Sequence, residues 1–176
     1  MKFFKKPVKF LQEESGVVAI EAAILLPILF TVVFFTSQIS IVFYNQYQMN
    51  IAANQAARQG TIYSSSRPTN ATIASLASAY LTGRLITFSP TPGTINVTAY
   101  SCPYTLGSNT FPDPTIGGSG CSSSTACPAS SYSSGNPTVI MVYVTYAFTG
   151  LFKNATQINP VNLTGTYTAN ASQICE

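Results

Sequence analysis

Glu21 is a lone carboxylate inside a long apolar run. The run begins after Gly16, and no charged residue follows Glu21 until Arg58. An ionised carboxylate in hydrocarbon costs about 2.5–3.5 kcal/mol on insertion scales, so an acid placed there normally has a partner. Cleavage between Gly16 and Val17 would supply one, because it frees an α-amine at the head of the same helix, with Glu21 as its fifth residue. The spacing predicts a pair between this amine and Glu21, within one subunit or between neighbours. A charge solvated at the membrane interface is the alternative.

These residues resemble the N-terminal segment of a prepilin, and most of all that of the TadE/TadF-like pseudopilins of the tight-adherence (Flp) pilus system. Such anchors have a glycine, several small apolar residues, a glutamate and an apolar stretch that runs into Leu-Pro. In this chain the pattern is formed by Gly16, Val17 to Ile20, Glu21 and Leu26-Pro27, followed by an Ala-Arg-x-Gly patch at residues 57–60. Major Flp pilins are usually shorter and carry Glu-Tyr at the position of Glu21-Ala22. The resemblance therefore favours a minor subunit.

The resemblance implies a function as a minor pilin or pseudopilin of a tight-adherence-type pilus or related secretion system, in pilus assembly, priming or adhesion. A prepilin peptidase would cut between Gly16 and Val17, and Glu21 would then guide the subunit into register. The implied partners are other pilin or pseudopilin subunits, the peptidase, an inner-membrane assembly platform and membrane lipid. The alternative is a membrane-anchored envelope protein that never polymerises and uses its exported domain for binding or adhesion.

The inventory of reactive side chains argues against an enzyme. The chain contains no histidine, which removes the usual general base and most metal sites. Beyond the apolar run its only acids are Asp113 and Glu176, a poor carboxylate pair for glycoside hydrolysis. We expect no enzymatic activity, no cofactor and no metal.

Four cysteines, Cys102, Cys121, Cys127 and Cys175, follow the apolar run. Zinc is disfavoured because the spacing of Cys121 and Cys127 is wider than the C-x2-C of zinc ribbons. An even number of cysteines in an exported domain indicates two disulfides. Sequence alone does not choose among the three pairings, and we prefer Cys121 with Cys127 and Cys102 with Cys175.

The distribution of charge predicts how the chain is oriented in a membrane. Four lysines against two glutamates leave residues 1–16 at +2, and four basic against three acidic residues leave the remainder at +1. Basic residues that flank a membrane helix stay in the cytoplasm, so the part after the helix should be exported. The prediction is a single-pass protein of the bacterial inner membrane, with an extracellular pilus as the second location to test, and with no basic patch for nucleic acid. A cleaved signal peptide is the rival, but the apolar run continues past Thr36 without a convincing small-x-small site.

These residues must be positioned by a long helix. We expect a basic leader over residues 1–16 and one helix over residues 17–60, about 65 Å long, with a transmembrane segment over about 17–44 and a stop at Gly60. Pro27 lacks an N–H, so it is expected to kink or locally melt the helix, unless it is simply tolerated in the membrane.

Residues 61–176 are expected to form an exported head, which makes the whole chain α+β. Helical spacing predicts a short amphipathic helix over residues 71–83, capped by Asn70 or Thr72, ended by Gly83 and folded onto an alanine stripe of the long helix. Strand signals lie at residues 85–88, 94–102, 138–148 and 163–174, and predict a three- to four-stranded antiparallel meander. A Ser/Gly/Pro-rich loop over residues 103–137 is unusually long and is therefore either functional or mobile.

Overall fold

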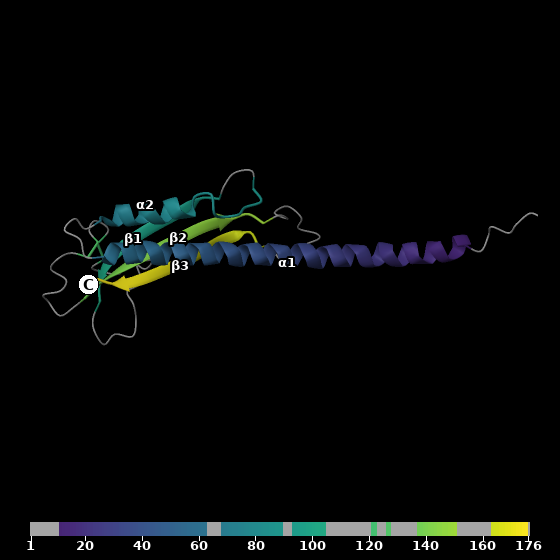
Figure 1. The fold of residues 1–176 in the computed structure, drawn as a ribbon, viewed down its shortest axis with the longest axis horizontal. Helices are drawn as coiled ribbons and strands as arrows, with labels where there is room; N and C mark the ends of the chain where they lie inside the picture. Colours follow the sequence, from purple (N-terminus) through teal and green to yellow (C-terminus); the bar gives the residue numbers. More distant parts are fainter. Residues whose placement is uncertain are drawn as a thin grey trace, which may run out of the picture. The chain divides into compact units, whose positions relative to one another are not determined.

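The computed structural model of the chain describes residues 11–62, 68–89, 93–104, 121–122, 126–127, 137–150 and 163–175 (Figure 1). The chain divides into two compact units, Met1–Ser40 and Ile41–Glu176, and the boundary falls within the first helix. Most of the predicted leader and most of the predicted loop over residues 103–137 lie outside the described residues.

Helix α1 spans Leu11–Thr61 and confirms the predicted long helix. The helix ends at Thr61, one residue beyond the end predicted near Gly60, and Gly60 is buried in its last turn. A Cβ atom at Gly60 would lie 2.5 Å from Cδ1 of Ile73 and 2.6 Å from Cδ1 of Ile140. Glycine therefore allows the close approach of α1 to its neighbours.

Helix α2 spans Asn70–Leu81 and confirms the predicted short helix. The N-cap is Thr69, whose hydroxyl accepts the N–H of Thr72 at 3.2 Å, so the predicted caps Asn70 and Thr72 are wrong. Gly83 follows the helix with a φ of 75°, which is the left-handed conformation expected of a glycine after a helix end.

Three strands form one antiparallel sheet in the order β1-β2-β3, as predicted for a meander. The strands are β1 (Ile95–Pro103), β2 (Thr138–Phe148) and β3 (Gly165–Ile174). Strand β2 is central and has the predicted bounds, because its Val, Ile and Tyr residues suit a strand that is buried on both faces. The α+β fold class is therefore confirmed.

The strand predicted over residues 85–88 is not formed. The backbone of Ile86 instead pairs with the side chain of Asn45 on α1. Asn45 Nδ2 donates to the Ile86 carbonyl at 2.7 Å, and the Ile86 N–H donates to Asn45 Oδ1 at 2.9 Å. An amide side chain thus takes the backbone hydrogen bonds that a neighbouring strand would have satisfied.

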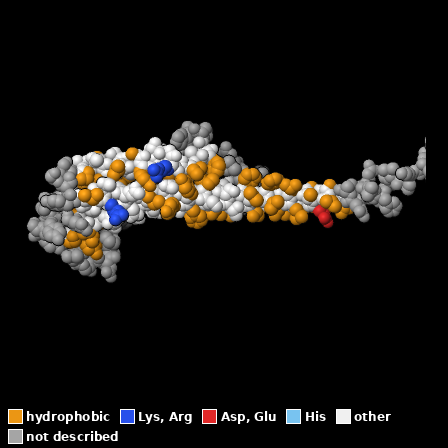
Figure 2. All heavy atoms as spheres, viewed as in Figure 1, with side chains coloured by type: hydrophobic (Ala, Val, Ile, Leu, Met, Phe, Trp, Pro, Cys, Tyr) orange, Lys and Arg blue, Asp and Glu red, His pale blue; other side chains and the backbone are white. Residues whose placement is uncertain are grey.

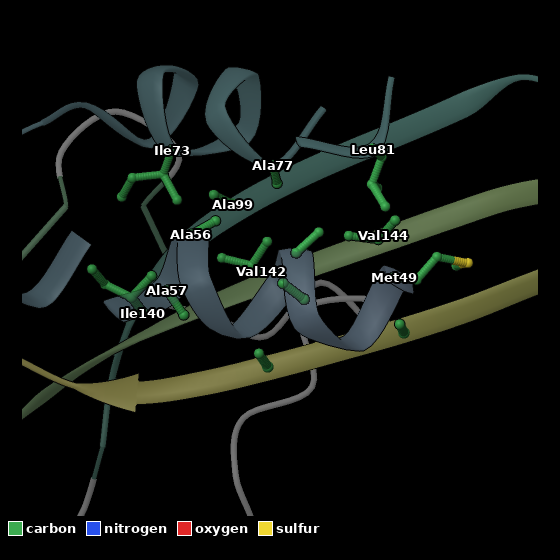
Figure 3. Close-up of a cluster of buried hydrophobic side chains, with 14 of the residues drawn as sticks. Met49, Ala56, Ala57, Ile73, Ala77, Leu81, Ala99, Ile140, Val142 and Val144 are labelled. Atoms are coloured by element: carbon green, nitrogen blue, oxygen red, sulfur yellow. The ribbon is translucent and has the colours of Figure 1, made fainter. Parts of the chain in front are cut away.

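The core of the head lies between the sheet and the two helices, as Figure 3 shows. The alanine stripe of α1, including Ala52 and Ala56, belongs to the same buried cluster as Ile73, Ala77 and Leu81 of α2. The two helices thus share one core with the sheet, while direct packing of the short helix onto the alanine stripe stays a prediction. The sheet contributes alternate residues, which fits a period of two: Ala99, Ile140, Val142, Val144, Tyr146, Phe148, Ala169 and Ala171.

The disulfide pairing that the sequence favoured is wrong. The structure joins Cys102 to Cys121, with Cα atoms 4.1 Å apart, and Cys127 to Cys175, with Cα atoms 5.5 Å apart. Cys121 and Cys127 both lie in the connection between β1 and β2. The first bond joins this connection to β1, and the second joins it to the residue that follows β3.

The sheet register explains why Cys102 and Cys175 do not pair. Cys102 lies opposite Val139 of β2, and Val139 lies opposite Ile174, the neighbour of Cys175. Two strand spacings of about 4.8 Å place the outer strands roughly 10 Å apart, beyond the reach of a disulfide. The two cysteines also lie on opposite faces of the sheet, since Cys102 packs with Val139 and Cys175 belongs to the helix-side core.

Candidate functional site

The N-terminal part of α1 is apolar on all sides. Every Val, Ile, Leu and Phe between Val17 and Phe34 is 42–64% exposed. Figure 2 shows orange side chains spread along this part of the helix. It is the one helix, among the described residues, that is long and apolar enough to cross a membrane, a criterion that a signal sequence also meets. This surface is suited to lipid or to other apolar helices.

Gly16, Val17 and Glu21 all lie in helical residues of α1 and are exposed. Val17 and Glu21 are four residues apart, so their side chains lie on the same face, one turn apart. Glu21 is the only acid whose side chain the structure describes, and the large apolar residues on either side of it, Ile20 and Ile24, are also exposed. A Cβ atom at Gly16 would meet nothing within 4 Å.

The hydroxyl groups of this apolar part are satisfied within the helix itself. Thr36 Oγ1 donates to the carbonyls of Val32 and Val33 at 3.0 Å. Ser37 Oγ donates to the Val33 carbonyl at 2.8 Å, and Ser40 Oγ donates to the Thr36 carbonyl at 2.8 Å. Internal hydrogen bonding of this kind lets polar side chains enter hydrocarbon, where water is absent.

Pro27 lies inside α1, and the helix is continuous through it. Its missing N–H leaves the carbonyl of Ala23 without the usual helical donor. One turn later, Thr31 Oγ1 donates to the Pro27 carbonyl at 2.8 Å. A kink at Pro27 remains a prediction.

Two buried asparagines of the head have roles that the sequence did not predict, since Asn45 was not singled out and Asn70 was expected only as a helix cap. Asn45 holds Ile86, as described above. Asn70, only 1% exposed, donates from Nδ2 to the Ser122 carbonyl at 2.8 Å, and its Oδ1 accepts the hydroxyl of Ser101 at 3.2 Å. Ser101 and Ser122 also exchange two backbone hydrogen bonds, of 2.9 and 2.7 Å. Asn70 thus fixes the start of α2 to β1 and to the segment that carries Cys121.

One signal in the sequence could have pointed to Asn45. It interrupts a stripe of residues at alternating spacings of three and four, with Val42 before it and Met49 and Ala52 after it, and this stripe is buried. A single amide in such a stripe must find partners. No comparable local pattern identifies Asn70, because its partners come from distant segments.

The described part of the head has little that titrates or binds metal. Among the described residues, no group of three or more His, Cys, Asp or Glu side chains could hold a metal ion. Burial raises the pKa of the Tyr167 phenol above its usual value, because desolvation disfavours the phenolate. Its hydroxyl donates to the Leu163 carbonyl at 2.8 Å, which gives it a structural role at the end of the sheet.

An N-terminal apolar helix of membrane-spanning length precedes a disulfide-bonded α+β head, an order that is consistent with a membrane anchor or a signal sequence. The family model described as TadE-like protein matches residues 16–58. Over that stretch the chain is similar to TadE-like proteins, and the predicted resemblance is confirmed. The match begins at Gly16, includes Glu21 and ends before α2, so it does not extend to α2 or the sheet. No curated protein and no solved structure matches the chain.

Proposed function

We propose that the chain is a minor pilin, or pseudopilin, of a tight-adherence-type pilus or a related secretion system. A prepilin peptidase cleaves it between Gly16 and Val17, and the mature helix joins other pilin-like subunits in assembly or priming, with the head displayed outside the membrane. The observation that carries the proposal is the TadE-like match over residues 16–58, and it is supported by Glu21, the fifth residue after Gly16 on an exposed apolar helix.

The balance of charge supports cleavage at this bond. In the uncleaved chain the N–H of Val17 is an uncharged group inside α1, and Glu21 has no described partner of opposite charge. Cleavage makes Val17 a cationic N-terminus one helical turn from the Glu21 carboxylate. The new helix dipole also places its positive end beside Glu21. The mature helix can therefore offset the cost of an acid in the membrane, which the precursor cannot.

The helical state of the bond also explains the choice of glycine. The bond between Gly16 and Val17 lies within α1, whereas a protease needs an extended backbone in its cleft. Glycine is about 1 kcal/mol less favourable than alanine in a helix interior, so Gly16 lowers the cost of local unwinding. Its open surroundings leave room for an approaching enzyme.

The proposed location is the bacterial inner membrane, with residues 1–16 in the cytoplasm and the head exported. The lysines of the leader support this orientation. The two disulfides support an oxidising compartment for the head. The proposed partners are the prepilin peptidase, an inner-membrane assembly platform, other pilin-like subunits and membrane lipid.

The proposal is tested by the intact mass of the full-length chain extracted from membranes of its own host. The expected mass starts at Val17, with or without a methyl group on the new amine. A Gly16→Ala variant should accumulate in the uncut form, because alanine stabilises the helix at the cut and adds a side chain there.

A mass that begins at Met1 would contradict the proposal and leave a tethered envelope protein as the function. A mass that begins beyond Ser40 would also contradict it, because the apolar segment would then be a signal sequence. Cells that lack the prepilin peptidase provide the matched control, in which the wild-type chain should stay uncut.

A further inference from the structure

A groove of about 620 Å³ lies between the C-terminal end of α1 and helix α2 in the head. Two buried alanines of α1, Ala52 and Ala56, line it, and their short side chains leave space between the helices. A second hollow, of about 330 Å³, shares the side chains of Gln59 and Leu76 with the first and continues along α2. The two hollows form one surface, which we call the α1–α2 groove.

The charged side chains that the structure describes at the α1–α2 groove are positive. Arg58 lines it directly, and the guanidinium carbon of Arg84 lies 4.0 Å from the ring centroid of Tyr80, which also lines it. Arg58 and Arg84 are the only charged side chains that the structure describes between residues 41 and 175. Figure 2 shows the described basic side chains in blue on one face of the head. Of the two described charges of the head, one therefore lines the groove and the other stacks on a residue that lines it.

The groove also presents apolar side chains to solvent. Ile62 is 55% exposed and Leu76 is 46% exposed, although both line the groove. The amides of Gln55 and Gln59 alternate with them as hydrogen-bonding groups. Exposed aliphatic side chains beside a cation match a peptide that carries both an aliphatic residue and a carboxylate.

The charge of the chain indicates that the occupant is a different protein. Beyond the leader and Glu21, the sequence offers only Asp113 and Glu176 as carboxylates. A second copy of this chain therefore offers few carboxylates to pair with Arg58 and Arg84 at the groove. A partner with an acidic segment supplies the complementary charge.

We infer that the α1–α2 groove binds an acidic amphipathic segment of a second exported protein. The carboxylate of that segment pairs with Arg58, and its aliphatic side chain packs against Leu76 and Ile62. This inference goes beyond the proposed function and does not depend on cleavage at Gly16, so the failure of one leaves the other standing.

The test places a photoreactive benzoyl-phenylalanine at Gln59 in the full-length chain, produced in its own host. After irradiation, mass spectrometry identifies the crosslinked peptide. The matched control carries the same residue at Thr98, an exposed position of β1 on the opposite face of the sheet. The expected result is an adduct at Gln59, absent at Thr98, with a peptide of another protein that has Asp or Glu within one helical turn of Leu, Ile or Val.

Two charge variants then test the role of Arg58. Arg58→Glu should lower the adduct yield by about tenfold or more, because it places like charges together, whereas Arg58→Lys should keep most of the yield. Both variants should retain the two disulfides and the unfolding temperature of the wild type, since Arg58 is exposed. If Arg58→Glu fails to fold, Leu76→Asp, also at an exposed position, provides the same test.

The inference is overturned if Gln59 gives no peptide adduct, or if the adduct is a second copy of the chain, a lipid or a glycan. It is overturned equally if a folded Arg58→Glu or Leu76→Asp variant leaves the yield unchanged.

Discussion

The two ends of helix α1 use apolar residues in opposite ways. Between Val17 and Phe34 the large apolar side chains are 42–64% exposed, whereas Val42, Met49 and Ala52 of the head are at most 9% exposed. The head end has a narrow buried stripe, and its exposed sides carry polar residues together with Phe43, Tyr44 and Tyr47. The membrane end has apolar residues all round.

This difference shows which end of α1 finds a hydrophobic core within the chain. Burial of one large aliphatic side chain is worth about 1.5–3 kcal/mol, so the exposed surface from Val17 to Phe34 is unsuited to water. The head buries its apolar residues against its own sheet and α2. The membrane end must therefore find its partners outside the chain, in lipid or in neighbouring helices.

A matched pair of leucine substitutions tests this contrast and has the largest expected effect. Leu81→Ala should lower the unfolding free energy of the head by about 3–5 kcal/mol, because Leu81 is fully buried and its loss leaves a cavity. Leu25→Ala, at a side chain that is 64% exposed, should change it by less than about 0.5 kcal/mol. Denaturant unfolding of the full chain in detergent, with tyrosine fluorescence as the signal, measures both. Equal losses in the two variants would contradict the division of the helix.

Removal of the disulfides sharpens the contrast, because both belong to the head. The bond between Cys127 and Cys175 spans 48 residues, and replacing both by serine should cost about 4 kcal/mol in the chain-entropy estimate. The bond between Cys102 and Cys121 spans 19 residues, and its removal should cost about 3 kcal/mol. Thermal unfolding gives the order of the two losses. Insertion of the chain into membranes should be unaffected by either change, and impaired insertion would argue that the anchor depends on the head.

The smallest stability effect concerns two asparagines of the same helix. Asn45→Ala should cost about 2–3 kcal/mol, because both backbone groups of Ile86 lose a buried partner. Asn54→Ala is the matched control, since Asn54 is exposed and donates only to the Asn50 carbonyl one turn away. Its cost should stay below about 0.5 kcal/mol. Similar costs for the two variants, in the same denaturant titration, would show that the amide of Asn45 does not hold the segment.

The sequence predicted well those elements whose signals are local. The bounds of β2 were predicted correctly, because a run of Val, Ile and Tyr without breakers permits little else. Helix α2 was found from its apolar spacing and from Gly83, whose φ of 75° confirms its place after the helix. The segment from Gly16 to Glu21 was recognised for the same reason, since its residues are consecutive in the chain.

The features that the sequence missed depend on distant residues. No strand forms over residues 85–88, because the side chain of Asn45 takes the backbone hydrogen bonds of Ile86. The two residues are 41 positions apart in the sequence. The disulfide pairing depends on the register of three strands, which sets both the distance and the face of each cysteine. Alternating hydrophobic residues predict where the strands lie but not the register in which they pair. A register shift of one residue would move every side chain of a strand to the other face of the sheet. Pairing between distant segments was therefore beyond local patterns.

Glu21 is the residue through which the membrane end of α1 is proposed to select its partners. The most direct test compares the wild-type chain with Glu21→Gln, which keeps the shape of the side chain and removes its charge. Both proteins carry a photoreactive residue at the exposed position Leu25, and both are analysed by intact mass and by crosslinking to neighbouring helices.

The expected result is that both chains start at Val17, while the yield of crosslinks to other pilin-like helices falls by about tenfold in Glu21→Gln, a change that corresponds to about 1.4 kcal/mol. A Glu21→Gln protein that is cleaved at the same bond and crosslinks to the same helices with undiminished yield would contradict the pairing of Glu21 with the freed amine.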